Sequence, residues 1–147
     1  MKLATLAILA VAALSLTGCS AVTDLLYKES ESTFFDAAEL RSDWGKADTV
    51  DWLPDDALEI SIRESTAGDP AVIRFSSDEG LADDDCAQTE RLSIPVFVDD
   101  WMPDDDDIVK LDTVWACGDW AVADIDGYWF GWTPSAPGEQ EVAPSAG

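Results

Sequence analysis

The chain has 147 residues, of which 31 are acidic, 8 are basic and none is histidine, and its formal net charge is −23. This balance excludes nucleic acid as an expected partner, because binding nucleic acid needs clustered lysine and arginine. The lack of histidine excludes Ser-His-Asp and Cys-His catalytic sites and the HExxH zinc site. The sequence therefore predicts a protein that is not an enzyme and that has no cofactor and no metal site.

The first eighteen residues have the features of a secretory signal peptide. Lys2 precedes an apolar run, residues 3–16, which is too short for a comfortable membrane-spanning helix of about 20 residues. The run ends in Leu16-Thr17-Gly18-Cys19, which resembles the lipobox of bacterial lipoproteins. By this resemblance Cys19 carries fatty acyl chains such as palmitate and becomes the first residue of a protein anchored outside the cytoplasmic membrane. The alternative is an ordinary signal peptide cut near Gly18.

The rest of the chain is expected to form one domain. Residues 1–18 contain one basic and no acidic residue, so the mature chain has a net charge of −24. Residues 19–30 are predicted to be a tether, and residues 31–133 to be a single globular domain. Residues 134–147 are rich in Pro, Ala and Glu, a composition that predicts a disordered tail.

The first element predicted in the domain is a helix over residues 32–43. Ser30 or Ser32 can cap its start, good helix formers follow, and Gly45 can end it. The next segment, "ALEISIRES" at 57–65, alternates apolar and polar residues as a half-buried strand does. A turn and "AVIRFSS" at 71–77 follow, which together predict a hairpin.

The second half of the domain is also expected to be mostly strands. Residues 78–90 are predicted to be a loop, residues 91–98 an edge strand interrupted by a proline, and residues 108–117 a further strand. Residues 120–133 are predicted to be a hairpin that turns at Asp126-Gly127, a strong type I′ signal. The predicted fold class is α+β, with one N-terminal helix packed on a small, mostly antiparallel sheet.

Two short motifs recur along the chain. "DWLPDD" at 51–56 returns as "DWMPDD" at 100–105, and "AGDPAV" at 67–72 resembles "CGDWAV" at 117–122. This pattern predicts two related units, each a corner followed by a hairpin. Proline suits the first position of a turn, and aspartate can bond the backbone N–H groups that a turn leaves open. We therefore favour structural corners with buried tryptophans, and the alternative is a tryptophan platform that binds a sugar.

The mature domain contains two cysteines, Cys86 and Cys117, which are 31 residues apart. Outside the cytoplasm an even pair of cysteines predicts a disulfide. A loop of this length would stabilise the fold by about 3–4 kcal/mol in the chain-entropy model. Metal binding is the rival interpretation, but no histidine and no further cysteine is near either residue to complete a site.

Other candidate binding features are acidic runs and an aromatic cluster. Calcium prefers carboxylates, but residues 83–85 and 104–107 lack EF-hand spacing, so solvated loops are expected. The candidate binding residues are Tyr128, Trp129 and Trp132 near the C-terminus. Alternation along a strand places Tyr128 and Trp132 opposite Trp129, so one set or the other can be exposed.

Together with the lipobox and the paired Trp-x-Pro segments, "CGDWAVADIDGYWFGWTP" at 117–134 resembles small secreted lipoproteins of actinobacteria. The resemblance implies a location and a small domain, but no reaction. We expect a lipid-anchored, non-enzymatic binding or interaction module of the cell envelope, whose partner is an unknown envelope component or a saccharide. The alternatives are a carbohydrate-binding module with exposed tryptophans and a hydrolase with paired carboxylates.

Overall fold

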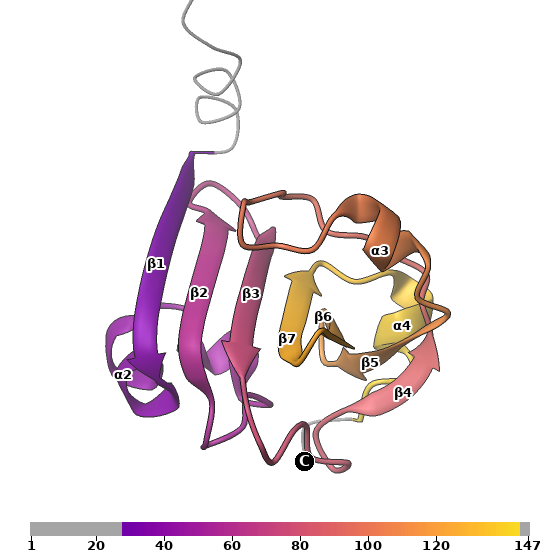
Figure 1. Cartoon of the computed structure of the whole chain (residues 1–147), viewed down its shortest axis with the longest axis horizontal. Coiled ribbons are helices and arrows are strands. Elements are labelled where there is room, and N and C mark those ends of the chain that lie inside the picture. Colours follow the sequence, from indigo (N-terminus) through magenta and orange to yellow (C-terminus); the bar gives the residue numbers. More distant parts are fainter. Residues whose placement is uncertain (1–27, 145–147) are drawn as a thin grey trace, which may run out of the picture.

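A seven-stranded antiparallel sheet dominates the computed structural model, which describes residues 28–144 (Figure 1). The strands are β1 (Glu29–Asp36), β2 (Leu58–Ser65), β3 (Ala71–Ser76), β4 (Ala87–Glu90), β5 (Thr113–Cys117), β6 (Trp120–Ile125) and β7 (Tyr128–Thr133). Their order across the sheet is β1-β2-β3-β7-β6-β5-β4, and every neighbouring pair is antiparallel. The prediction of a mixed fold with a mostly antiparallel sheet is confirmed.

The helical elements are short. They are α2 (Ala37–Asp43), the 3₁₀ helix η1 (Ala47–Val50), α3 (Asp105–Val109) and α4 (Pro137–Gln140). Among the described residues no helix is long and apolar enough to cross a bilayer. The predicted signal peptide, residues 1–18, and the lipidation site Cys19 lie outside the described residues.

The helix predicted over residues 32–43 is wrong in its first part, which belongs to β1. β1 pairs along its length with β2, and Phe34 lies opposite Ile60 in this register. The aromatic and β-branched residues of β1 suit a strand, and pairing outweighs their modest helix propensity. The helix begins later, because the Asp36 carboxylate accepts the backbone N–H of Glu39 at 2.8 Å and caps α2.

Both faces of the sheet are buried, because side chains alternate along each strand and each face has its own cover. The first face, which we call the α2 face, lies under α2 and η1, and its core includes Leu40 and Ile73. The opposite face, which we call the loop face, lies under residues 91–112, and its core includes Met102 and Trp132. A domain of this size therefore has two hydrophobic cores that share one sheet.

Both hairpins predicted from the sequence are confirmed. β2 and β3 pair across the turn at residues 66–70. β6 and β7 pair across Asp126 and Gly127, whose φ angles of 55° and 83° are the positive values that a type I′ turn requires. In both cases a local turn signal between two apolar runs was enough to place the strands.

Four predictions for the second half of the chain are wrong in whole or in part. Residues 91–98 form no strand, although their side chains alternate between buried and exposed positions. The segment 108–117 is divided between the end of α3 and β5, and the last residues of the predicted loop 78–90 form β4. The tail predicted to be disordered from residue 134 contains α4, and it is described as far as residue 144.

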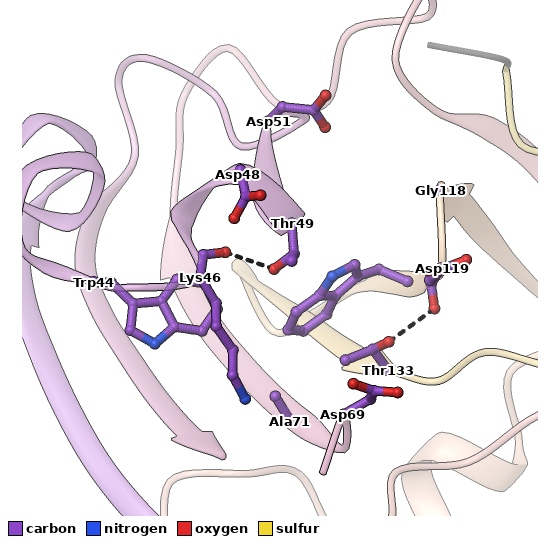
Figure 2. A pocket seen from close by; sticks show the side chains of 11 residues that line it. Trp44, Lys46, Asp48, Thr49, Asp51, Asp69, Ala71, Gly118, Asp119 and Thr133 are labelled. Carbon is purple, nitrogen blue, oxygen red and sulfur yellow. Dashed lines mark hydrogen bonds between the residues drawn. The ribbon is translucent and has the colours of Figure 1, made fainter. Parts of the chain in front are cut away.

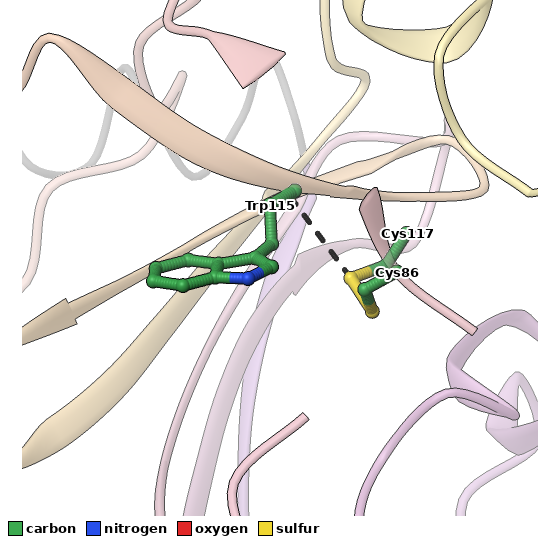
Figure 3. Close-up of a disulfide and its surroundings, with 3 residues drawn as sticks. All are labelled: Cys86, Trp115 and Cys117. Atoms are coloured by element: carbon green, nitrogen blue, oxygen red, sulfur yellow. Dashed lines mark hydrogen bonds between the residues drawn. A yellow bond between two sulfur atoms is a disulfide. The ribbon is translucent and has the colours of Figure 1, made fainter. Parts of the chain in front are cut away.

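The Cys86–Cys117 disulfide is confirmed, with an S–S distance of 2.04 Å and a Cα–Cα distance of 4.4 Å (Figure 3). Ala87 pairs with Ala116, so the disulfide continues the β4–β5 ladder by one more position. The Sγ of Cys117 also lies 4.0 Å from the carbonyl oxygen of Trp115. A half-cystine has no S–H to donate, so we interpret this approach as a van der Waals contact.

Candidate functional site

The aromatic residues predicted to bind a ligand do not form a common surface. Trp132 is fully buried, and its Nε1–H donates to the hydroxyl of Ser93 at 2.8 Å. Trp129 is half-buried on the α2 face, where it stacks on Phe75 with the ring centroids 6.4 Å apart. Tyr128 is half-buried and packs against the loop-face core, so Trp129 and Tyr128 cannot hold one ligand between them.

A pocket of about 330 Å³ opens elsewhere, between η1 and two turns (Figure 2). These turns contain Gly68-Asp69 and Gly118-Asp119, and we call them the Gly-Asp turns. Figure 2 shows Asp48 and Thr49 of η1 on one side and Asp119 and Thr133 on the other, with Asp69 below them. The lining residues are Trp44, Lys46, Asp48, Thr49, Asp51, Asp69, Ala71, Gly118, Asp119, Trp120 and Thr133. The pocket has the size of a small-ligand site, for which volumes of about 300–1,000 Å³ are typical.

One wall of the pocket is the segment that follows α2. Trp44 ends the helix, and its Nε1–H donates to the carboxylate of Glu64 at 3.0 Å. Lys46 lies 2.9 Å from the same carboxylate and donates to the carbonyl oxygens of Ser65 at 3.1 Å and Gly68 at 3.3 Å. These bonds fix η1 against the β2–β3 turn, so the wall is attached to the sheet.

The opposite wall is the turn between β5 and β6. The carbonyl oxygen of Asp119 accepts the hydroxyl of Thr133 at 3.1 Å and the backbone N–H of Ser135 at 2.8 Å. Gly118 has a φ of 58°, which a glycine adopts without strain. The preceding residue is Cys117, so the disulfide holds this turn at its start. The two walls are therefore held by separate sets of bonds.

The pocket is strongly acidic. Four carboxylates line it, those of Asp48, Asp51, Asp69 and Asp119, and all four residues are exposed. The described residues give these carboxylates no hydrogen bond and no ion pair. Lys46 is the single basic residue in the lining, and its ammonium is already paired with Glu64. The pocket thus presents unpaired negative charge to whatever enters it.

The acidic runs do not gather into a metal centre within residues 28–144, where no group of three or more Cys, Asp or Glu side chains is arranged to hold an ion. The most buried carboxylate, that of Glu139, lies outside the pocket lining. It accepts the backbone N–H groups of Leu92, Ser93 and Ala136 at 2.7–3.0 Å and the hydroxyl of Ser93 at 2.6 Å. With four donors, Glu139 is a structural anchor.

Two groups outside the pocket have shifted pKa values, and both are structural. Burial opposes ionisation of Asp56, but hydrogen bonds from the Ser77 hydroxyl and two backbone N–H groups outweigh it and lower the pKa of this carboxyl. Burial also opposes the charge of Arg63, but its bonds with Glu29 and Asp99 outweigh burial and raise the pKa of the guanidinium.

Sequence reasoning missed the pocket, although it found two of its parts. The repeated Gly-Asp pair predicted two turns, and Asp69 and Asp119 are the acids of those turns. The local pattern did not indicate that η1 would lie between these turns. The turns come close because β3 and β6 both pair with β7, and this order of the strands is not visible in the local sequence. A signal was present in the acids of η1, which are clustered in "KADTVD" at 46–51.

The comparisons with known proteins add no assignment, since no family model, no curated protein and no solved structure matches the chain.

Proposed function

We propose that the protein is a lipid-anchored module of the cell envelope that binds a small polar ligand in the pocket between the Gly-Asp turns and performs no chemistry on it. The observation that carries this proposal is the pocket itself. Its two walls are fixed by independent hydrogen bonds, while its four carboxylates have no partner among the described residues. A preformed cavity with a few polar groups at its lining is the usual form of a small-ligand site.

The geometry favours binding over hydrolysis. A hydrolase with paired carboxylates keeps one of them protonated, and enclosure in a protein cavity is a common way to raise its pKa. The four carboxylates of the pocket are exposed instead. Glu139 is buried, but its four hydrogen bonds leave it no freedom to approach a substrate.

The geometry also favours the pocket over an open aromatic platform. All seven tryptophans are within the described residues, and each is buried or half-buried. A saccharide bound by this protein would therefore enter a cavity, where Trp44 and Trp120 supply aromatic surface. Carbohydrate binding remains the second candidate function in this modified form.

The anchor is tested by replacing the lipidated residue. We expect Cys19→Ser to abolish incorporation of labelled palmitate and to release the domain from the membrane fraction. The variant has no acyl chain, and even a single chain holds a protein on the bilayer only marginally. A variant that still takes up palmitate and stays with the membrane would overturn the lipid anchor. The pocket proposal does not depend on this result.

The pocket is tested by titrating the soluble domain with glucose, glucosamine and spermidine and recording the indole N–H resonances by NMR. At least one compound should shift the resonance of Trp120 and bind the wild-type protein. Thr49→Arg places a cation among the carboxylates and should remove that binding. Thr113→Arg is the matched control, because both threonines are exposed and each makes one side-chain hydrogen bond. The proposal fails if none of the three binds, or if both variants bind as the wild type does.

A further inference from the structure

The pocket contains a hydrogen-bond donor as well as carboxylates. Trp120 is 2 % exposed and lines the pocket. Its Nε1–H makes no hydrogen bond to the described residues. It is not among the polar atoms that are sealed inside the protein without a partner, whereas the Nε1 of Trp52 is. The N–H of this otherwise buried indole therefore lacks an acceptor without being sealed from solvent, and the pocket that Trp120 lines is the space from which an acceptor can reach it.

This donor restricts the chemistry of the ligand. A buried or half-buried N–H gains from an acceptor such as a hydroxyl or ether oxygen. A fully protonated polyamine has donors only, so it can neutralise the carboxylates but cannot accept from Trp120. The ligand that satisfies this atom carries at least one oxygen acceptor.

The carboxylates restrict it further. Four aspartates against one lysine give the lining a net charge of −3, and that lysine is already paired with Glu64. A neutral sugar can donate hydroxyl hydrogens to carboxylates, but it leaves this charge uncompensated. An ammonium group donates up to three hydrogens and offsets one of these negative charges, and charge-assisted hydrogen bonds are about twice as strong as neutral ones.

The aromatic walls complete the description. The ring of Trp44 is positioned by its own N–H bond to Glu64, so the indole is held in place at the pocket. Indole rings present an apolar face with negative partial charge, which suits both the C–H face of a sugar ring and a nearby ammonium. A cavity of about 330 Å³ has room for a small ring.

From these features we infer that the pocket binds an amino sugar, in which ring hydroxyls and a free, protonated amine occur on one small scaffold. The amine lies among the aspartates, a ring oxygen or hydroxyl accepts from Trp120, and the C–H face of the ring packs on indole. This inference rests on the proposed function of the same pocket and adds the class of ligand.

The test compares glucosamine with three compounds that each lack one feature, using calorimetry together with the indole N–H resonances. Glucose lacks the amine, N-acetylglucosamine carries its nitrogen as a neutral amide, and spermidine lacks the oxygen acceptors. We expect glucosamine to bind about five- to tenfold more tightly than either neutral sugar at low salt, and the difference to shrink as salt screens the aspartates. Spermidine should bind without moving the Trp120 resonance downfield.

Trp120→Phe tests the donor while keeping an aromatic ring. We expect it to weaken glucosamine binding about two- to tenfold, as the loss of one hydrogen bond would, and to leave spermidine binding unchanged. Trp115→Phe is the matched control, because Trp115 is half-buried and does not line the pocket. Thermal melts of both variants show whether they fold. If Trp120→Phe does not fold, the shift of the Trp120 resonance in the wild-type protein on addition of glucosamine tests the donor instead.

The possible results separate the two proposals. If glucose or N-acetylglucosamine binds as tightly as glucosamine, or if glucosamine leaves the Trp120 resonance in place, the amino-sugar inference is wrong while the pocket remains a ligand site. If no compound binds, the proposed function fails and the inference fails with it. Tighter binding of spermidine than of glucosamine would assign the pocket to polyamines instead.

Discussion

The two Asp-Trp-x-Pro-Asp-Asp segments form the same turn but give their tryptophans different surroundings. In the first, the backbone N–H of Leu53 donates to the carbonyl oxygen of Val50 at 2.9 Å, and in the second Met102 donates to Asp99 at 2.9 Å. Trp52 is 3 % exposed, whereas Trp101 is half-exposed. The predicted burial is confirmed for Trp52 and wrong for Trp101, so the motif specifies a backbone corner and not the environment of its ring.

The side chains of the sheet determine how deeply the Trp52 and Trp101 rings are buried. Trp52 lies over Gly131 of β7, and a Cβ at this glycine would be 3.5 Å from the Trp52 ring and 2.8 Å from Ile73. The absence of a side chain at Gly131 therefore makes room for Ile73 and Trp120, and the Trp52 ring packs beside them on the α2 face, with its centroid 5.8 Å from that of Trp120. On the loop face, Trp132 of β7 is itself part of the buried core. Trp101 packs only against the outside of this core, and its Nε1–H donates to Glu31 at 3.1 Å.

The largest expected effect separates the two corners directly. Trp52→Ala should lower the free energy of unfolding by about 3–5 kcal/mol, because it leaves a large cavity in the α2-face core. Trp101→Ala should cost about 1 kcal/mol, the value expected for a partly exposed ring that contacts Arg74 at 5.8 Å. Chemical denaturation of the two single variants measures both.

A control and a contrary result are available for this pair. The buried Nε1–H of Trp52 has no acceptor in the described part of the chain, so Trp52→Phe removes an unpaired donor and should cost clearly less than Trp52→Ala. Equal losses for Trp52→Ala and Trp101→Ala would mean that the two corners are energetically equivalent, and the contrast drawn here would be incorrect.

A smaller loss of stability is expected when Glu139 is replaced, because this carboxylate holds the segment that covers the loop face. Glu139→Ala removes the acceptor of four hydrogen bonds, of which three fix Leu92 and Ser93 at the start of the loop-face cover and one comes from Ala136. Leaving these donors unpaired in a buried place should cost about 3 kcal/mol. Glu141→Ala is the matched control, because Glu141 is exposed at the end of the same helix and should be near neutral.

Proteolysis locates this effect within the molecule. Because Glu139 bonds Leu92 and Ser93 and not the first corner, its loss should open the segment 91–98 to cleavage before the α2 face unfolds. Cleavage at both corners together, or an unchanged melt of Glu139→Ala, would show that the two covers are not independent.

The sequence predicts those parts of the fold that short-range patterns encode. The β2–β3 and β6–β7 hairpins follow from alternation and turn residues, and the disulfide follows from an even pair of cysteines in a chain whose first residues predict export. The sequence predicts helix for residues 32–36 of β1, because the fit of this segment as a strand depends on pairing with β2, about thirty residues away. Such pairing cannot be read from the local composition of a segment.

Two further predictions are wrong for related reasons. α4 was expected to be disordered because its composition is that of a linker, but the burial of Glu139 against Ser93 orders it. Residues 91–98 alternate as a strand does, yet they cross the loop face without joining the ladder. The candidate pocket depends on the order of strands around β7, so only the structure brings its two Gly-Asp turns and η1 together.

The smallest expected effect concerns the last acid of each corner. Asp56 accepts the Ser77 hydroxyl at 2.5 Å and the backbone N–H groups of Asp78 and Glu79 at 2.9 and 3.0 Å. Its counterpart Asp105 is exposed in the first turn of α3. Asp56→Asn should therefore cost about 1 kcal/mol, as the loss of a capping carboxylate does, and Asp105→Asn should cost a few tenths at most.

The pH dependence of this difference has a definite sign. The folded-state pKa of Asp56 is lowered from the ordinary value of 3.8, so its contribution to stability is fully present above that value and is lost as pH falls through the lower, folded-state pKa. We expect the gap in unfolding free energy between wild type and Asp56→Asn to be constant near about pH 7 and to narrow as pH falls below the ordinary pKa of 3.8. Urea unfolding of wild type, Asp56→Asn and Asp105→Asn across this range measures it. A gap that widened on acidification would mean that the hydrogen bonds favour the protonated carboxyl, and the assignment of Asp56 as an ionised cap would be wrong.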